Sequence, residues 1–88
     1  MKVLKFGAIW CRECLVMRPI WEEIEKEISG FKTEYYDADE NPEAIKKYKI
    51  EDVPVFVFLD KNGQEFFRLE GSQNKDELTK IIKENLNK

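Results

Sequence analysis

The 88-residue sequence predicts an α/β protein built on a four-stranded mixed sheet, with helices on both faces. Three observations indicate this fold. Short apolar runs alternate with amphipathic stretches in the first half, which is typical of a strand–helix–strand unit with parallel strands. A turn sequence at residues 60–63 (DKNG) separates two runs of β-forming residues and indicates an antiparallel hairpin. A last amphipathic stretch completes the order β-α-β-α-β-β-α, and a single domain over residues 1–88 is expected.

The first strand and helix are predicted from hydrophobic periodicity. Residues 3–9 are mostly apolar, which is consistent with a buried strand. From Cys11 onward, apolar side chains recur at three- and four-residue steps, which predicts a long helix that ends near Gly30. Met17 and Trp21 follow this spacing and are expected to lie in the core. Pro19 falls inside this helix and is expected to kink it, because proline removes a backbone hydrogen bond.

A second strand and a short helix are expected next. Residues 31–37 contain β-forming side chains. Asn41 and Pro42 then predict a helix start, because asparagine caps helices and proline suits the first helical position. This helix is expected to reach about Tyr48.

The second half predicts a hairpin and a final helix. Residues 55–59 and 64–70 are the two strands of the hairpin, and Gly71 ends the second strand. Asn74, with Glu77 three residues later, resembles a helix-capping box. The apolar stripe of the final helix consists of Leu78, Ile81, Ile82 and Leu86.

Composition excludes several classes of function. Fifteen basic and eighteen acidic side chains are mixed along the chain and give a net charge of −3, so no nucleic-acid partner is expected. The absence of histidine removes Ser-His triads and most mixed zinc sites, so neither a metal nor a cofactor is expected. No apolar run approaches the roughly 18 residues of a membrane span, and residues 1–6 are too interrupted by lysine for a signal sequence. We expect a soluble, cytoplasmic monomer without membrane contact.

The two cysteines, Cys11 and Cys14, are the only strong nucleophiles of the chain. A helix that begins at Cys11 directs its free N–H groups and its positive dipole end at the first sulfur, which favours the thiolate. Cys14 lies one turn later on the same face, close enough to form or resolve a disulfide. A purely structural disulfide is disfavoured, because so short a loop would contribute only about 2 kcal/mol. Cys11 is therefore the candidate nucleophile, and Cys14 the candidate resolving thiol.

The chain resembles the thioredoxin family at positions spread over most of its length. These positions are Trp10, the two cysteines, Pro19, Asp39-Glu40-Asn41-Pro42, Tyr48, Val53-Pro54, Lys61-Asn62-Gly63 and Gly71. The match begins at the strand before the cysteines, without the amino-terminal strand and helix of full-length thioredoxins, so the outline is closer to that of glutaredoxins. The resemblance implies a thioredoxin-like fold and thiol–disulfide oxidoreductase activity.

The resemblance also implies roles for residues around the cysteines. The Val53-Pro54 peptide bond is expected to be cis and to lie beside the disulfide, where its backbone would pair with an extended substrate segment. Gly71 would lie near the active site and let a partner approach, although a glycine that simply ends a strand is the alternative. Trp10 is expected to shield the sulfur and to offer a flat surface to substrates, with plain packing as the alternative.

Three departures from the family pattern concern the electrostatics of the site. Arg12 and Glu13 stand where thioredoxins usually have Gly-Pro; arginine favours the Cys11 thiolate and glutamate opposes it. Lys5 replaces the buried aspartate that manages protons for the second cysteine. Lys5 either extends to solvent or stabilises a Cys14 thiolate, and Glu13 is a candidate for the proton-transfer role. Gly7 replaces the usual tryptophan beneath the active site.

The expected function is protein-disulfide reduction through a mixed-disulfide intermediate. The partners would be disulfide-containing protein substrates, with a reductase or a low-molecular-weight thiol as the electron donor. Two alternatives stay open from the sequence. One is a glutaredoxin-like, glutathione-dependent reductase, and the other is a non-catalytic redox-sensing or binding module with the same fold.

Overall fold

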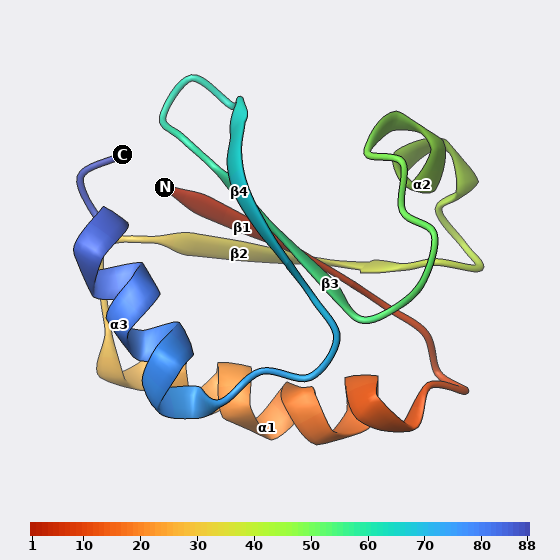
Figure 1. Ribbon diagram of the computed structural model, residues 1–88, viewed down its shortest axis with the longest axis horizontal. Coiled ribbons are helices and arrows are strands. Elements are labelled where there is room, and N and C mark those ends of the chain that lie inside the picture. Colours follow the sequence, from red (N-terminus) through yellow and green to blue (C-terminus); the bar gives the residue numbers. More distant parts are fainter.

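The computed structural model describes residues 1–88, which form one four-stranded sheet and three helices (Figure 1). The strands are β1, Lys2–Gly7; β2, Lys32–Asp37; β3, Val55–Leu59; and β4, Glu65–Glu70. The helices are α1, Arg12–Glu27; α2, Pro42–Lys47; and α3, Lys75–Asn85. The predicted order of elements is confirmed.

The sheet is mixed, as predicted, and its strand order is β2-β1-β3-β4. β1 runs parallel to β2 and antiparallel to β3, and β3 pairs with β4 as an antiparallel hairpin. β1 therefore has a hydrogen-bonded neighbour on each side, which fixes the position of its carboxyl end. The chain leaves that end directly into the segment that contains the two cysteines.

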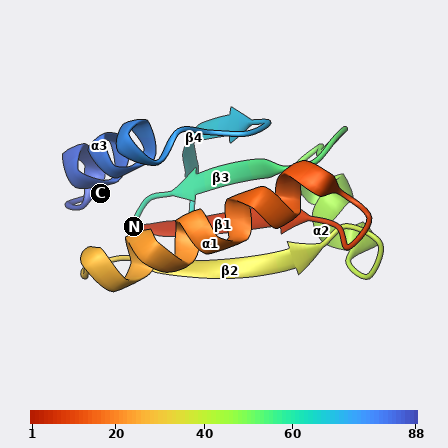
Figure 2. The same ribbon diagram turned by 90° about the horizontal axis from the view of Figure 1, so that it is seen from below.

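The helices cover both faces of the sheet. α1 and α3 pack over a cluster of nine buried residues that includes Met17 and Trp21, each 2% exposed, which confirms the core positions predicted for both. α2 lies against the opposite face, where Ala44 and Ile45 pack on a second cluster of six buried residues. Alternation along β3 separates the clusters, since successive strand residues point to opposite faces. Figure 2 shows α1 crossing in front of the sheet.

β1 is shorter than predicted, because it ends at Gly7 and not at Ile9. The N–H of Cys11 bonds to the carbonyl of Ala8 at 3.2 Å, which turns the chain immediately after the strand. Ile9 lies in this turn and is 77% exposed. The predicted strand included Ile9 because this residue is apolar, but its side chain does not enter the core.

α1 ends at Glu27, before the predicted end near Gly30. Ile28 has extended backbone dihedral angles, while its N–H still bonds to the carbonyl of Ile24 and closes the last turn. The helix continues through Pro19.

The starts of the other two helices are capped differently. The side chain of Asn74 accepts hydrogen bonds from the N–H groups of Asp76 and Glu77, at 2.8 and 3.2 Å, which confirms the predicted cap of α3. Asn41 occupies the cap position of α2, but its side chain makes no capping bond. It donates instead to the carbonyl of Asp37 at 2.9 Å, because the amide closes the turn that leads from β2 into α2.

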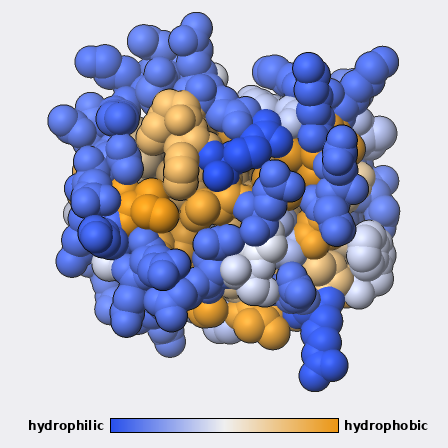
Figure 3. All heavy atoms as spheres, in the orientation of Figure 1, coloured by the Kyte–Doolittle hydropathy of each residue, from blue (hydrophilic) through white to orange (hydrophobic).

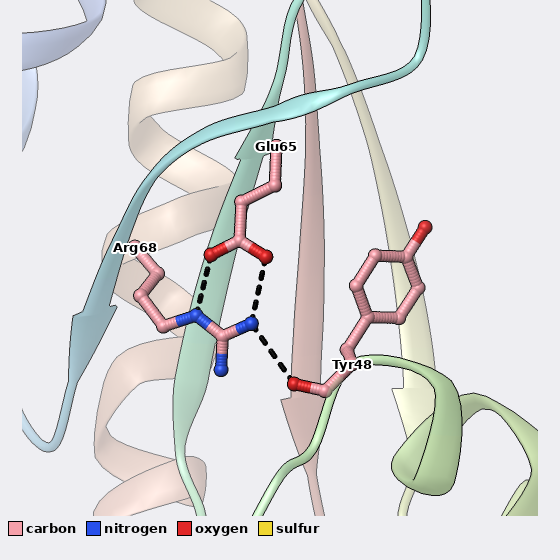
Figure 4. Close-up of polar contacts among 3 residues, drawn as sticks. All are labelled: Tyr48, Glu65 and Arg68. Carbon is pink, nitrogen blue, oxygen red and sulfur yellow. Dashed lines mark hydrogen bonds and ion pairs between the residues drawn. The ribbon is translucent and has the colours of Figure 1, made fainter.

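Arg68 connects β4 to the residue that follows α2 (Figure 4). Its Nη2 donates to the carbonyl of Tyr48 at 2.9 Å and to Oε1 of Glu65 at 2.7 Å, and its Nε also bonds to the Glu65 carboxylate. The paired guanidinium lowers the pKa of Glu65 below its ordinary value of 4.5. The arginine thus helps to hold the chain that leads toward Pro54.

None of the three helices combines the length and hydrophobicity needed to cross a lipid bilayer.

Replacing Glu65 by Gln is expected to lower the free energy of unfolding by about 0.5 kcal/mol at neutral pH, the size of a solvent-screened pair. Because the folded-state pKa of Glu65 is lowered, its stabilising contribution is present above the ordinary value of 4.5 and is lost as the pH falls through the folded value. The difference between wild type and Glu65→Gln, measured by urea denaturation, should therefore shrink below pH 4.5. Exposed Glu51 provides the control Glu51→Gln, and a difference that grows on acidification would contradict the expectation.

Candidate active site

Cys11 lies at the junction between β1 and α1, where it is the N-cap residue of the helix. Its backbone is extended, with φ −90° and ψ 114°, and its Sγ accepts a hydrogen bond from the N–H of Cys14 at 3.2 Å. The sulfur thus takes the place that a serine or aspartate oxygen usually has at a helix start. This geometry brings the two cysteines together, one helical turn apart.

The Cys11 sulfur lies at the start of a helix and beside the backbone of Val53. Backbone N–H groups at the start of α1 and the positive end of the helix dipole both stabilise an anion there. Arg12 and Glu13 follow in the first turn, and both are exposed. Cys11 is 7% exposed, and its thiol donates a long hydrogen bond, 3.7 Å, to the carbonyl of Val53. The Val53-Pro54 peptide bond is cis, which confirms the expectation from the family resemblance.

The Cys14 thiol lies in an environment that disfavours charge. Burial is the largest cause and raises the pKa of Cys14 from 9.0 to about 12. A hydrogen bond with Cys11 and repulsion from Cys11 and Glu13 act in the same direction, whereas a hydrogen bond with the backbone of Ala8 acts against them. Cys14 therefore keeps its proton at neutral pH.

A cavity of about 290 Å³ adjoins Cys14. It lies between α1 and the sheet, and its walls include Lys5 and Gly7 of β1, Tyr35 of β2 and Pro54 before β3. Cys11 is not among the lining residues. The cavity therefore gives access to the second cysteine of the pair from the side of the sheet.

Lys5 runs along the wall of this cavity with its side chain 19% exposed. Its Nζ forms an ion pair with Glu25 of α1 at 3.0 Å and lies 5.8 Å from the centre of the Trp21 ring. The ammonium group is thus held by a carboxylate and an aromatic face. Lys5 is not among the causes of the shifted Cys14 pKa, whereas Glu13 is.

Trp10 projects from the turn before the cysteines and is 66% exposed. Its indole Nε1 donates to Oδ2 of Asp39 at 2.9 Å, so the exposed ring is anchored to the segment between β2 and α2. The sequence contains both residues in its family-like positions, but their pairing was not predicted. No local pattern shows it, because 29 residues separate the two.

Gly71 lies next to Pro54, since its N–H donates to the Pro54 carbonyl at 2.8 Å. Gly71 has a φ of +83°, which disfavours side chains, and a Cβ added there would meet no atom within 4 Å. Gly71 thus places no side chain beside Pro54, which is itself buried.

Tyr35 is a residue of the site that sequence analysis did not identify. A Cβ built on Gly7 would lie 3.1 Å from the Tyr35 hydroxyl oxygen and 3.3 Å from Sγ of Cys14. The only sequence signal is alternation along β2, which places Tyr35 in phase with Thr33 and Asp37 but does not say which face they share.

Apolar side chains are exposed around the cysteines. Ile9, Trp10, Leu15 and Val16 are between 51% and 77% exposed. Figure 3 shows that hydrophilic residues cover much of the visible face, with apolar surface between them and along the edge formed by α1. No three Cys, Asp or Glu side chains are grouped in a way that would hold a metal ion.

Comparison with known proteins identifies the family. Residues 1–84 match the family model described as thioredoxin. A thioredoxin of Rickettsia bellii is 38% identical over 85 residues, which cover 96% of this chain and 80% of the relative. Thioredoxin H5 of Oryza sativa subsp. japonica is 35% identical over 74 residues, which cover 84% of this chain but only 54% of the relative.

A solved thioredoxin structure is also similar to this chain. The X-ray structure of Fasciola hepatica thioredoxin superposes with a TM-score of 0.86 at 36% identity, covering 96% of this chain and 79% of the other. The sheet order, the three helices and the Cys11–Cys14 spacing agree with this similarity. The chain belongs to the thioredoxin family, and its function is that of a thiol–disulfide oxidoreductase.

Proposed function

We propose that this chain reduces disulfide bonds of other proteins, with Cys11 as the nucleophile and Cys14 as the resolving thiol. The observation that carries the proposal is the hydrogen bond from the Cys14 N–H to the Cys11 sulfur, 3.2 Å long, at the start of α1. It directs a backbone donor and the positive end of the helix at one sulfur only. The other sulfur is held as a neutral thiol by burial.

In the first step, the Cys11 thiolate attacks one sulfur of a substrate disulfide. A bond forms between Cys11 and that sulfur, while the second substrate sulfur leaves as a thiolate and takes up a proton from solvent. Cys14 does not compete in this step, because its pKa of about 12 keeps the thiolate fraction low at neutral pH.

In the second step, Cys14 loses its proton and attacks the Cys11 sulfur. The Cys11–Cys14 disulfide forms, and the bond to the substrate breaks with its electron pair on the departing sulfur. The substrate has then gained two electrons and the pair has lost two. A reductase or a low-molecular-weight thiol in a reducing compartment such as the cytoplasm would return them.

The surface around the cysteines supports a protein as the substrate. The exposed apolar side chains of Ile9, Trp10, Leu15 and Val16 provide contact area that a small disulfide would not need. An extended substrate segment would lie along the backbone at Val53. The Val53 N–H now donates to the Asp52 carboxylate at 2.8 Å, so the substrate would displace that carboxylate to form a backbone pair.

Two cysteine variants separate the proposed roles, with insulin as the disulfide substrate and dithiothreitol as the donor. Cys14→Ser should still attack but fail to resolve, so a covalent adduct with the substrate accumulates on non-reducing gels and disappears on reduction. Cys11→Ser should form no adduct, and turnover should fall to the level of the Cys11→Ser/Cys14→Ser double variant. An adduct formed by Cys11→Ser would show that the roles are assigned the wrong way round.

The Cys11→Ser variant also tests the environment of Cys14, which is then the only thiol. Burial, the largest cause of the raised pKa, remains in this variant, while the contributions of Cys11 are removed. The pKa of Cys14, followed by the ultraviolet absorbance of the thiolate, should therefore lie between 9.0 and about 12. A value below 9.0 would show that burial does not raise the pKa of Cys14.

A further inference from the structure

The face of the sheet beneath α1 contains a small gap at Gly7. Every second residue of β1, namely Val3, Lys5 and Gly7, lies on this face of the sheet. Lys5 is in register with Tyr35 of the neighbouring strand β2. A Cβ on Gly7 would lie 3.1 Å from both Cε1 and the hydroxyl oxygen of Tyr35. It would also lie 3.3 Å from Sγ of Cys14. The tyrosine hydroxyl and the Cys14 thiol thus face the same gap, which even one methyl group would crowd.

Tyr35 connects this gap with solvent. The residue is 48% exposed, and it lines the same cavity of about 290 Å³ as Cys14. None of the hydrogen bonds within the structure uses the Tyr35 hydroxyl, whereas the adjacent Tyr36 hydroxyl donates to Glu34 at 3.0 Å. The Tyr35 hydroxyl is therefore free to bond with a thiol on one side and with water on the other.

The second step of the proposed reaction requires a route for a proton. Cys14 is neutral when the mixed disulfide forms, and it must lose its proton to attack the Cys11 sulfur. Two nearby carboxylates are poorly placed to take that proton. Glu25 is engaged by Lys5 at 3.0 Å, and Glu13 precedes Cys14 directly, so it projects from a different side of the helix.

We propose that the Tyr35 hydroxyl relays the proton of Cys14 during the resolving step. The hydroxyl oxygen accepts the thiol proton while its own proton passes to water in the cavity. The Cys14 sulfur then bonds to the Cys11 sulfur, and the electron pair of the broken bond leaves with the substrate thiolate. This relay rests on the proposed function, because it concerns the step in which Cys14 resolves the mixed disulfide.

The charged groups around Cys14 and Tyr35 favour a tyrosine that relays a proton over one that is already deprotonated and acts as a base. The charged groups that lie on the cavity or act on Cys14 or Tyr35 are Lys5, Glu13, Arg18, Glu22, Glu25 and Asp37. The pKa of Tyr35 is raised, first by burial and then by the charges of Asp37 and Cys14, while Arg18 acts in the opposite direction. The hydroxyl thus keeps its proton at neutral pH and can pass one proton on only as it accepts another.

The test compares Tyr35→Phe with wild type and with the matched control Tyr36→Phe. Each reduced protein reacts with the chromogenic disulfide dithiobis(nitrobenzoate), which releases one thiolate on attack by Cys11 and a second on resolution by Cys14. Tyr35→Phe should leave the first phase unchanged and slow the second by about 100-fold or more near pH 7. The ratio should fall as the pH rises, because hydroxide then removes the Cys14 proton directly. Tyr36→Phe should resemble wild type in both phases.

A second variant keeps the test independent of the tyrosine itself. Gly7→Ala places a methyl group in the gap and should slow the second phase while sparing the first. The relay is wrong if Tyr35→Phe leaves the second phase unchanged, slows it equally at every pH, or matches Tyr36→Phe. Loss of the first phase in wild type would instead count against the proposed function, so the two failures can be told apart.

Discussion

The hydrogen bond between the Cys14 N–H and the Cys11 sulfur fixes the geometry of the redox pair. It exists because α1 starts at Arg12 and leaves Cys11 in the cap position. That start depends on the turn closed by Cys11 on Ala8, and the turn begins where β1 ends. β1 is in turn held between two strands. A helix that started one residue later would no longer direct its free N–H groups at the first sulfur.

The two cysteines have different surroundings, on which their proposed roles depend. The first sulfur lies at the helix start, whereas partial burial raises the pKa of the second thiol, which keeps its proton. Lys5 and Gly7, two departures from the family pattern, lie on the same side of β1 and form part of the cavity beside Cys14. Lys5 is held by Glu25 and Trp21, and the space left at Gly7 is faced by Tyr35. The candidates for transferring the proton of Cys14 in this protein are therefore residues other than a buried aspartate.

Much of this could be predicted from the sequence, because local chemistry determines it. The spacing of Met17 and Trp21 predicted the buried face of α1, and the order of apolar runs and turn residues predicted the mixed sheet. The prediction failed where a local pattern had two meanings. The apolar Ile9 extended the predicted strand, although it lies exposed in a turn. Asn41 occupies a cap position but uses its amide elsewhere.

The contacts that complete the site could not be predicted, because they join residues far apart in the chain. Trp10 bonds to Asp39, Lys5 pairs with Glu25, and Tyr35 reaches the gap at Gly7 only through the register of β1 with β2.

The difference in reactivity between Cys11 and Cys14 can be measured by limited alkylation of the reduced protein with iodoacetamide at pH 7. Trypsin cleaves after Arg12 and so separates the two cysteines for mass spectrometry. The Cys11 peptide is expected to carry at least about ten times more label. Equal labelling, or labelling of Cys14 first, would contradict the assignment of Cys11 as the nucleophile.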